Sequence, residues 1–157
     1  MINEETIGLL NELTHVSKSG ELGYRTAAAD VRNSQLQSVF SEYAKQRGTC
    51  VHQLQSEVER LGGVAVDSGT ITAAVHRGWI DLKAALSGGD GGAIIAACET
   101  GEDYTLAAFE RAVNAGITGE TLAIVEKQCG KIKEAHTRLV RLKSEIAAGA
   151  EFRRTEP

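Results

Sequence analysis

The chain has 157 residues, a formal net charge of −4, one proline and 4% aromatic residues, which suits one helical domain with a buried core. Lysines and arginines are scattered among acidic residues, no run approaches 18 apolar residues, and the N-terminus lacks a basic segment followed by an apolar one. These features predict no nucleic-acid partner, no membrane span and a cytoplasmic location.

Four long helices and one shorter helix are predicted in a single domain over residues 1–148, followed by a flexible tail at 149–157. The predicted helices cover residues 3–31, 34–61, 70–86, 91–114 and 118–148. The start of each long helix has a residue that can cap it: Asn3, Asn33 or Ser34, Asp90 and Thr118. The glycine pair at 62–63 ends the second helix.

The connections between these helices predict their topology. Short turns make the first two and the last two long helices antiparallel neighbours. The segment 62–89, with the 70–86 helix inside it, is long enough to return the chain to the other end of the bundle. We therefore predict an all-α, ferritin-like four-helix bundle of two hairpins with a long helical crossover between its second and third long helices.

Polar residues interrupt the apolar stripe of each long helix near its middle. Burying a lone charge is costly, so these side chains are expected to meet one another, water or a ligand. Counted from the turns near residues 32 and 117, Ser17 and Arg47 lie 15 residues away, and Glu102 and Lys133 lie 15 and 16 residues away. The predicted buried polar centre consists of Ser17, Arg47, Cys50, Glu102, Lys133 and His136.

Several landmarks carry a resemblance to a known family. Tyr24 and Phe109 each follow a polar centre residue by seven positions, and the chain contains the stretches GYRTAAADV, HRGWIDLKAAL, GED and IKEAH. Over about residues 5–145 the sequence resembles an uncharacterised bacterial family of ferritin-like bundles, a domain of unknown function within the ferritin/rubrerythrin-like superfamily. The resemblance implies a fold and implies no activity.

The resemblance also implies where metal ligands would stand. In the superfamily, two helices each supply a Glu and two supply Glu-x-x-His around a di-iron or di-manganese centre. Here those positions hold Ser17, Arg47 with Cys50, Glu102, and Lys133 with His136. Only Glu102 and His136 are retained, and two cations would repel a metal pair. We predict a degenerate centre without metal or other cofactor, in which the cations pair with Glu102 and with Glu21 or Glu99.

Three alternatives remain open. A metal-dependent oxidoreductase or metal-binding protein would use iron or manganese at a residual Glu102/His136 site. A stress sensor would use Cys50 as a thiol with a pKa lowered by Arg47. A weaker metal pattern joins Glu12 and His15 to His52, for which solvent exposure is favoured, while His76 has no visible partner.

The favoured interpretation assigns no catalytic residue and predicts a binding, assembly or stress-related protein, not an enzyme. A homodimer is plausible, because such bundles associate along helix faces, and Trp79 is expected to pack against the bundle or to form part of a self-association surface. The partner or ligand is left open. The cysteines Cys50, Cys98 and Cys129 are far apart and have no CxxC spacing, which indicates buried thiols in a reducing compartment.

Overall fold

The computed structural model describes residues 1–66, 79 and 81–155. All secondary-structure elements in these ranges are helices, so the all-helical prediction is confirmed. They are α1 (Asn3–Asp30), α2 (Ser34–Arg60), α3 (Leu82–Gly88), α4 (Gly91–Val113) and α5 (Gly119–Thr155). No helix in the described part of the chain has the length and apolar character needed to cross a membrane.

Local signals in the sequence account for several helix ends. The Asn33 side chain accepts a hydrogen bond from the Leu36 amide at the start of α2, and Asp90 accepts one from the Gly92 amide at the start of α4. Gly62 has a φ of +87° just after α2, a conformation that glycine adopts without strain. Asn3 does not cap α1: it is the first helical residue, and Ile2 stands at the cap position.

The crossover helix predicted at 70–86 is described only in part. Residues 67–78 and 80 lie outside the described residues, and the described helix α3 covers Leu82–Gly88, so it ends two residues after the predicted end. Helix α5 continues to Thr155, past the predicted helix end at residue 148. Between residues 148 and 155 the chain has no proline, and a single glycine does not stop a helix.

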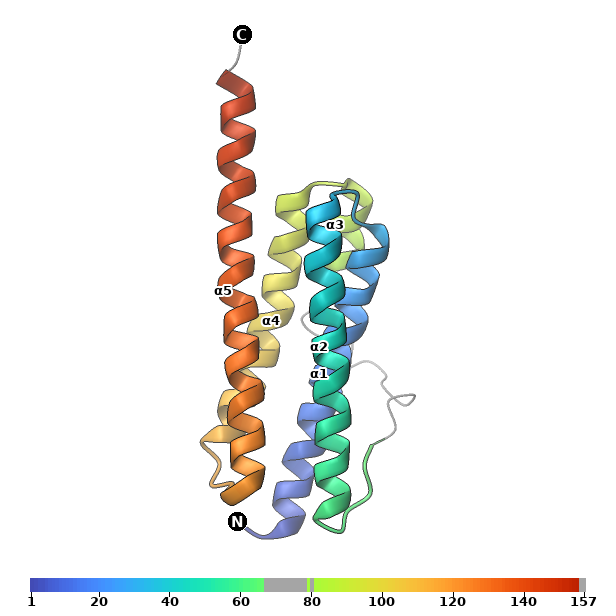
Figure 1. Ribbon diagram of the computed structural model, residues 1–157, viewed down its shortest axis with the longest axis vertical. Coiled ribbons are helices and arrows are strands. Elements are labelled where there is room, and N and C mark those ends of the chain that lie inside the picture. Colours follow the sequence, from blue (N-terminus) through green and yellow to red (C-terminus); the bar gives the residue numbers. More distant parts are fainter. Residues whose placement is uncertain (67–78, 80, 156–157) are drawn as a thin grey trace.

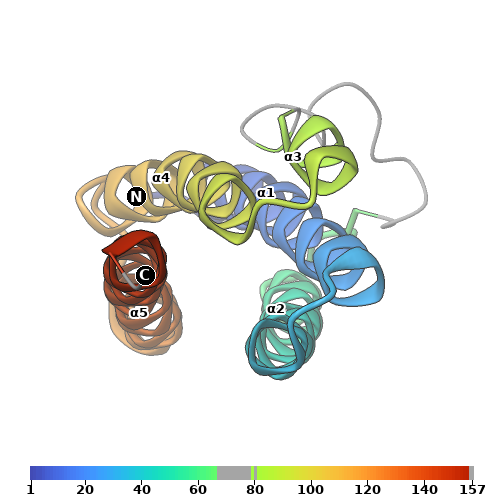
Figure 2. The ribbon, with the colours of Figure 1, turned by 90° about the horizontal axis from the view of Figure 1, so that it is seen from above.

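The four long helices form two antiparallel hairpins that pack through α1 and α4. In Figure 1, α1 runs upward from the N-terminus, α2 returns downward, α4 starts again at the top, and α5 runs upward past the ends of the others. Seen from above in Figure 2, α1 and α4 lie side by side, with α2 next to α1 and α5 next to α4. The α2 and α5 helices make much less contact with each other than the two hairpin pairs do.

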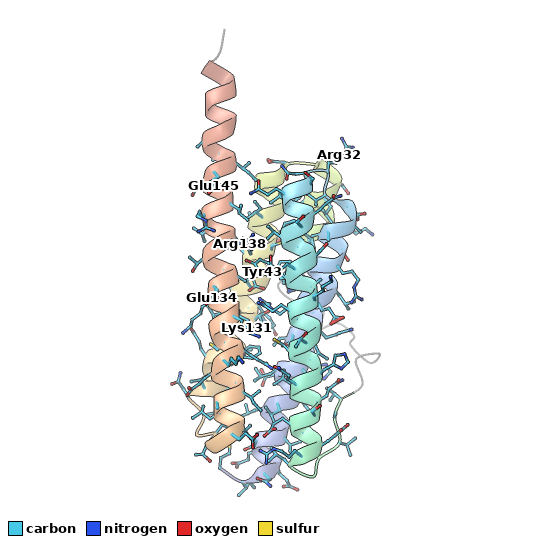
Figure 3. The ribbon with its side chains drawn as sticks, in the orientation of Figure 1. Arg32, Tyr43, Lys131, Glu134, Arg138 and Glu145 are labelled. Atoms are coloured by element: carbon cyan, nitrogen blue, oxygen red, sulfur yellow. The ribbon has the colours of Figure 1, made fainter. Side chains whose placement is uncertain are left out.

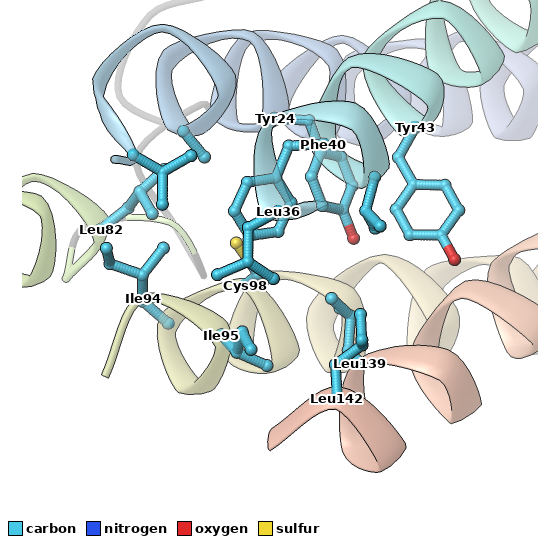
Figure 4. Packing of buried hydrophobic residues seen from close by; sticks show 14 of the residues in the cluster. Tyr24, Leu36, Phe40, Tyr43, Leu82, Ile94, Ile95, Cys98, Leu139 and Leu142 are labelled. Carbon is cyan, nitrogen blue, oxygen red and sulfur yellow. The ribbon is translucent and has the colours of Figure 1, made fainter. Parts of the chain in front are cut away.

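Apolar side chains fill two clusters along the length of the molecule. The first joins Tyr24 and Phe40 to Ile95 and Leu139, as Figure 4 shows. The second lies toward the opposite ends of the same helices and is built mainly from aliphatic residues with Phe109. Along α2 and α4, the buried charged residues Arg47 and Glu102 fall between these clusters. The fold therefore places one charged layer between two apolar layers.

Candidate functional site

A completely buried ion pair joins α2 to α4. Arg47 and Glu102 each have 0% of their side-chain surface exposed. Arg47 Nη1 donates to Glu102 Oε1 at 2.5 Å and Nη2 donates to Oε2 at 2.7 Å, so the contact is bidentate. A planar guanidinium matches a carboxylate in this geometry, and both carboxylate oxygens are engaged.

A glycine on α1 makes room for the arginine. A Cβ atom at Gly20 would lie 3.2 Å from Arg47 Nη1, close enough that the guanidinium would have to shift by a few tenths of an ångström. The guanidinium can therefore lie against the α1 backbone while its fork points toward α4. This explains how a long, charged side chain is accommodated at full burial.

Tyr24 lies beside the pair and completes its surroundings. Arg47 Cζ stands 5.5 Å from the centroid of the Tyr24 ring, within cation–π range. Burial raises the pKa of Tyr24 well above its usual value, and the negative charge of Glu102 raises it further. For Arg47, burial by itself would lower the pKa, but the Glu102 charge and hydrogen bonds raise it above its ordinary value. Arg47 thus stays protonated while Tyr24 stays neutral.

Trp79 occupies a notch formed by glycines of two helices. A Cβ atom at Gly23 on α1 or at Gly101 on α4 would overlap the indole ring. The indole packs edge-on against Tyr24, with ring centroids 5.0 Å apart and planes at 72°, and Trp79 is only 7% exposed. Its predicted packing against the helices is therefore what the structure shows, and the ring covers the α1–α4 side of the charged layer.

Four buried polar atoms around this layer have no hydrogen-bond partner among the described residues. They are Ser17 Oγ, Tyr24 Oη, Arg47 Nε and Trp79 Nε1. Neither the arginine nor the indole nitrogen can accept a hydrogen bond, so neither can act as a general base. Ser17 is fully buried and makes no hydrogen bond to a base in the described structure, so nothing activates its hydroxyl as a nucleophile. The arrangement is suited to holding helices together.

The structure separates the α5 residues from the predicted centre. The prediction that Lys133 is buried there is wrong: its side chain is 58% exposed, and its amine lies 4.0 Å from Glu110. His136 is 29% exposed and its Nε2 lies 2.7 Å from Asp103, not beside Glu102. At this height, the positions of α5 that face the core include Cys129, Ile132, Ala135 and Leu139. Lys133 follows Ile132 by about 100° of helical rotation and so leaves the apolar face.

The other acids proposed as partners of the centre lie elsewhere. Glu21 is buried but binds Lys18 and Arg25 of its own helix, each at 2.8 Å. Glu99 binds Lys143 at 2.9 Å. Arg47 is therefore neutralised by Glu102 alone among the proposed acids. The expectation of two buried cations sharing several carboxylates is corrected to one cation with one carboxylate.

The donor set does not fit a dinuclear metal centre. Both Glu102 oxygens bind a guanidinium that does not lose its proton near neutral pH, and His136 binds Asp103. Within the described residues, no three His, Cys, Asp or Glu side chains are grouped to hold a metal ion. Of the weaker candidates, Glu12 lies 3.4 Å from Arg111 and His52 is exposed, while His76 lies outside the described residues.

The pKa expected for Cys50 is also corrected. Burial raises the pKa of its thiol, and the opposing effects of Arg47 and Lys131 do not reverse that shift. Cys98 is buried beside Glu102, and its pKa is raised as well. All three cysteines are free and buried. Because the thiolate is the reactive form, the structure argues against Cys50 as a reactive thiol.

Two buried features were not predicted from the sequence. The first is the notch for Trp79, which glycines inside helices at positions 20, 23 and 101 could have indicated, because mid-helix glycine is unfavourable unless another group must approach closely. The second is Glu57, which is buried in the last turn of α2. It binds Arg60, and it accepts a hydrogen bond from Thr121 at 2.6 Å. These contacts lower the pKa of Glu57. The one feature of the sequence that could have indicated this ion pair is the spacing of three residues between Glu57 and Arg60.

Fold and centre together define an all-helical protein with a closed, charged interior. A family model for a domain of unknown function, DUF2383, matches residues 5–115, and the chain therefore belongs to this family. The matched region contains both members of the Arg47–Glu102 pair and ends before α5. No curated protein matches the sequence significantly.

Proposed function

We propose that the chain is a ferritin-like four-helix protein in which the Arg47–Glu102 pair stands in place of a metal centre, and that it acts by binding or assembly and not as an enzyme. The observation that carries this proposal is the completely buried bidentate pair, which engages both oxygens of the only acid retained at the ligand positions. A dinuclear centre needs those oxygens together with further carboxylates.

The course of the chain supports the ferritin-like part of the proposal. The α1–α2 and α4–α5 pairs are antiparallel hairpins, and the chain returns to the top of Figure 1 between α2 and α4. One long connection of this kind characterises ferritin-like bundles. Arg47 and Glu102 also lie near the middle of their helices, between two apolar clusters, which is where the resemblance would put metal ligands.

The form of α5 supports the assembly part. This helix continues past the ends of its neighbours in Figure 1. The protruding length leaves helix surface that a second copy can cover, so the expected assembly is a homodimer. A cytoplasmic location belongs to the same proposal, because three free, buried thiols suit a reducing compartment.

Metal analysis of protein purified without an affinity tag tests the proposal. We expect iron and manganese far below one ion per chain, in the wild type and in Glu102→Ala alike. Stoichiometric iron or manganese that is lost in Glu102→Ala but kept in the exposed control Glu110→Ala would contradict the proposal. It would favour the alternative, a metal-dependent oxidoreductase or metal-binding protein that uses Glu102 and His136.

Light scattering during size-exclusion chromatography tests the assembly part separately. The expected mass is that of two chains. A single-chain mass over a wide range of loading concentrations would overturn the homodimer and leave the proposal about the centre untouched.

A further inference from the structure

A groove separates α2 from α5 on the face that the two hairpins leave open. It has a volume of about 440 Å³, within the range of small-molecule sites. Its lining includes Glu42, Tyr43 and Gln46 from α2 and Lys131, Glu134 and Arg138 from α5. Figure 3 labels Tyr43 on α2 and Lys131, Glu134 and Arg138 on the neighbouring α5.

Cationic side chains outnumber carboxylates along the groove. Its lining holds four cationic residues (Lys131, Lys133, Arg138 and Arg141) and two carboxylates (Glu42 and Glu134). Arg138 binds Glu42, and Lys133 and Arg141 each lie 4.0 Å from an acid outside the lining, Glu110 and Glu145. Helix α5 as a whole has eight Lys or Arg and five Asp or Glu, a net charge of +3, whereas the rest of the chain has nine Lys or Arg and sixteen Asp or Glu, a net charge of −7. The positive charge of α5 favours the approach of a small anion.

Two polar groups in the groove lack a partner among the described residues. Lys131 is half-buried and no described carboxylate lies within ion-pair distance of its amine. The Oε1 atom of Gln46 is buried and accepts no hydrogen bond there. Because the two ends of an amide exchange by a simple flip, Gln46 can present either its oxygen as an acceptor or its NH₂ group as a donor.

The buried floor of the groove and its Arg138 side chain are held in place by neighbouring residues. Tyr43 and Ala135 are buried, so part of the groove surface is shielded from water. Arg138 stands 5.8 Å from the centroid of the Tyr43 ring and donates to Glu42 at 3.1 Å, which fixes its guanidinium and neutralises that acid. Glu134 is exposed at the rim, where solvent screens its repulsion.

We propose that this groove binds a small anion through a phosphate or carboxylate group, with Lys131 and the Gln46 amide on one side and Arg138 on the other. The half-buried ammonium gains an opposite charge, and the amide gains an acceptor for its N–H groups. Both gains are larger over a shielded floor than in open water. The inference rests on the proposed binding role and names small anions as the class of ligand. It does not depend on the absence of metal from the centre.

Titration with inorganic phosphate and, in parallel, with succinate tests the inference on the full chain at low ionic strength. Backbone and side-chain amide resonances of ¹⁵N-labelled protein report the binding position. We expect saturable shifts of the Gln46 side-chain amide and of residues around Lys131. Saturation by phosphate identifies a phosphate site, saturation by succinate a carboxylate site, and either result supports the inference.

Matched variants distinguish a built site from general charge attraction. Lys131→Gln should weaken binding about tenfold, the loss expected for one charged hydrogen bond. Gln46→Leu changes no charge and should weaken binding by a smaller factor, while Lys45→Gln alters an exposed cation that lines a different groove and should leave binding unchanged. Wild-type-like spectra before titration establish that each variant is folded.

Three outcomes would overturn the inference. One is the absence of saturable binding of both anions, and a second is a set of shifts that avoids α2 and α5. The third is an equal loss of affinity in Lys131→Gln and Lys45→Gln, which would indicate attraction by overall charge. None of these outcomes bears on the metal content of the centre, so the two proposals fail separately.

Discussion

Gln46 and Arg47 are adjacent on α2, yet they face two different environments. Arg47 points toward α1 and α4, where its ion pair with Glu102 is closed off from water and Trp79 covers one side. Gln46 borders the groove toward α5, where the ion pair between Arg138 and Glu42 is 36% and 61% exposed. The same kind of charge pair thus has little screening on one side of the helix and strong screening on the other.

The size of the residues between the helices explains this difference. Glycines at positions 20, 23 and 101 let the Arg47 side chain and the Trp79 ring lie directly against the α1 and α4 backbones. Facing α2, α5 presents Lys131, Glu134 and Arg138, whose long charged side chains keep contact with water. Small residues therefore close one side of α2, and large charged residues keep the other side open.

Removing Glu102 should have the largest effect of the changes considered. The Glu102→Ala variant leaves the Arg47 charge buried without a partner, so we expect a loss of about 3–5 kcal/mol in the free energy of unfolding. Urea unfolding followed by circular dichroism measures it. Replacing both residues, Arg47→Met with Glu102→Leu, removes the charges together and should restore most of the stability. A loss below about 1 kcal/mol in the single variant is the size expected for an exposed pair. It would show that the Arg47–Glu102 pair is as well screened as the pair between Arg138 and Glu42.

Filling the glycine notch should have the next largest effect. A methyl group at Gly101 overlaps the Trp79 indole, so Gly101→Ala should cost about 1–3 kcal/mol and change the fluorescence of this sole tryptophan. In the matched control, Gly8→Ala, the added methyl group meets no described atom within 4 Å and replaces a mid-helix glycine. This control should gain about 0.5–1 kcal/mol. Equal effects of the two substitutions would mean that Trp79 does not fill the notch in solution.

Breaking the exposed pair should have the smallest effect. The Glu42→Gln variant removes the carboxylate that binds Arg138 at 3.1 Å, and we expect a change within about 0.5 kcal/mol in the same urea experiment. That change should shrink further when the salt concentration is raised, because exposed charges are screened. A loss comparable to that of Glu102→Ala would show that the groove is as closed as the interior.

Part of the centre could be predicted because it depends on spacing along helices. Arg47 and Glu102 each lie 15 residues from the turn of their own hairpin, which is the middle of helices of this length, and the rule that buried charges need partners suggested their pairing. Lys133 satisfied the same count and still lies at the surface, because its rotation about α5 and the separation of α5 from α2 decide its exposure. Counting residues gives height along a helix and leaves the direction of a side chain open.

Sequence alone determined the helical character of this protein, the caps at Asn33 and Asp90, and the presence of charged residues in the middle of apolar stripes. These properties follow from local propensity and from periodicity. Only the tertiary structure decided which charges are buried, that Trp79 occupies a notch of glycines from two helices, and that α2 and α5 enclose a groove. Those outcomes depend on how closely separate helices approach, a distance set by side chains far apart in the chain.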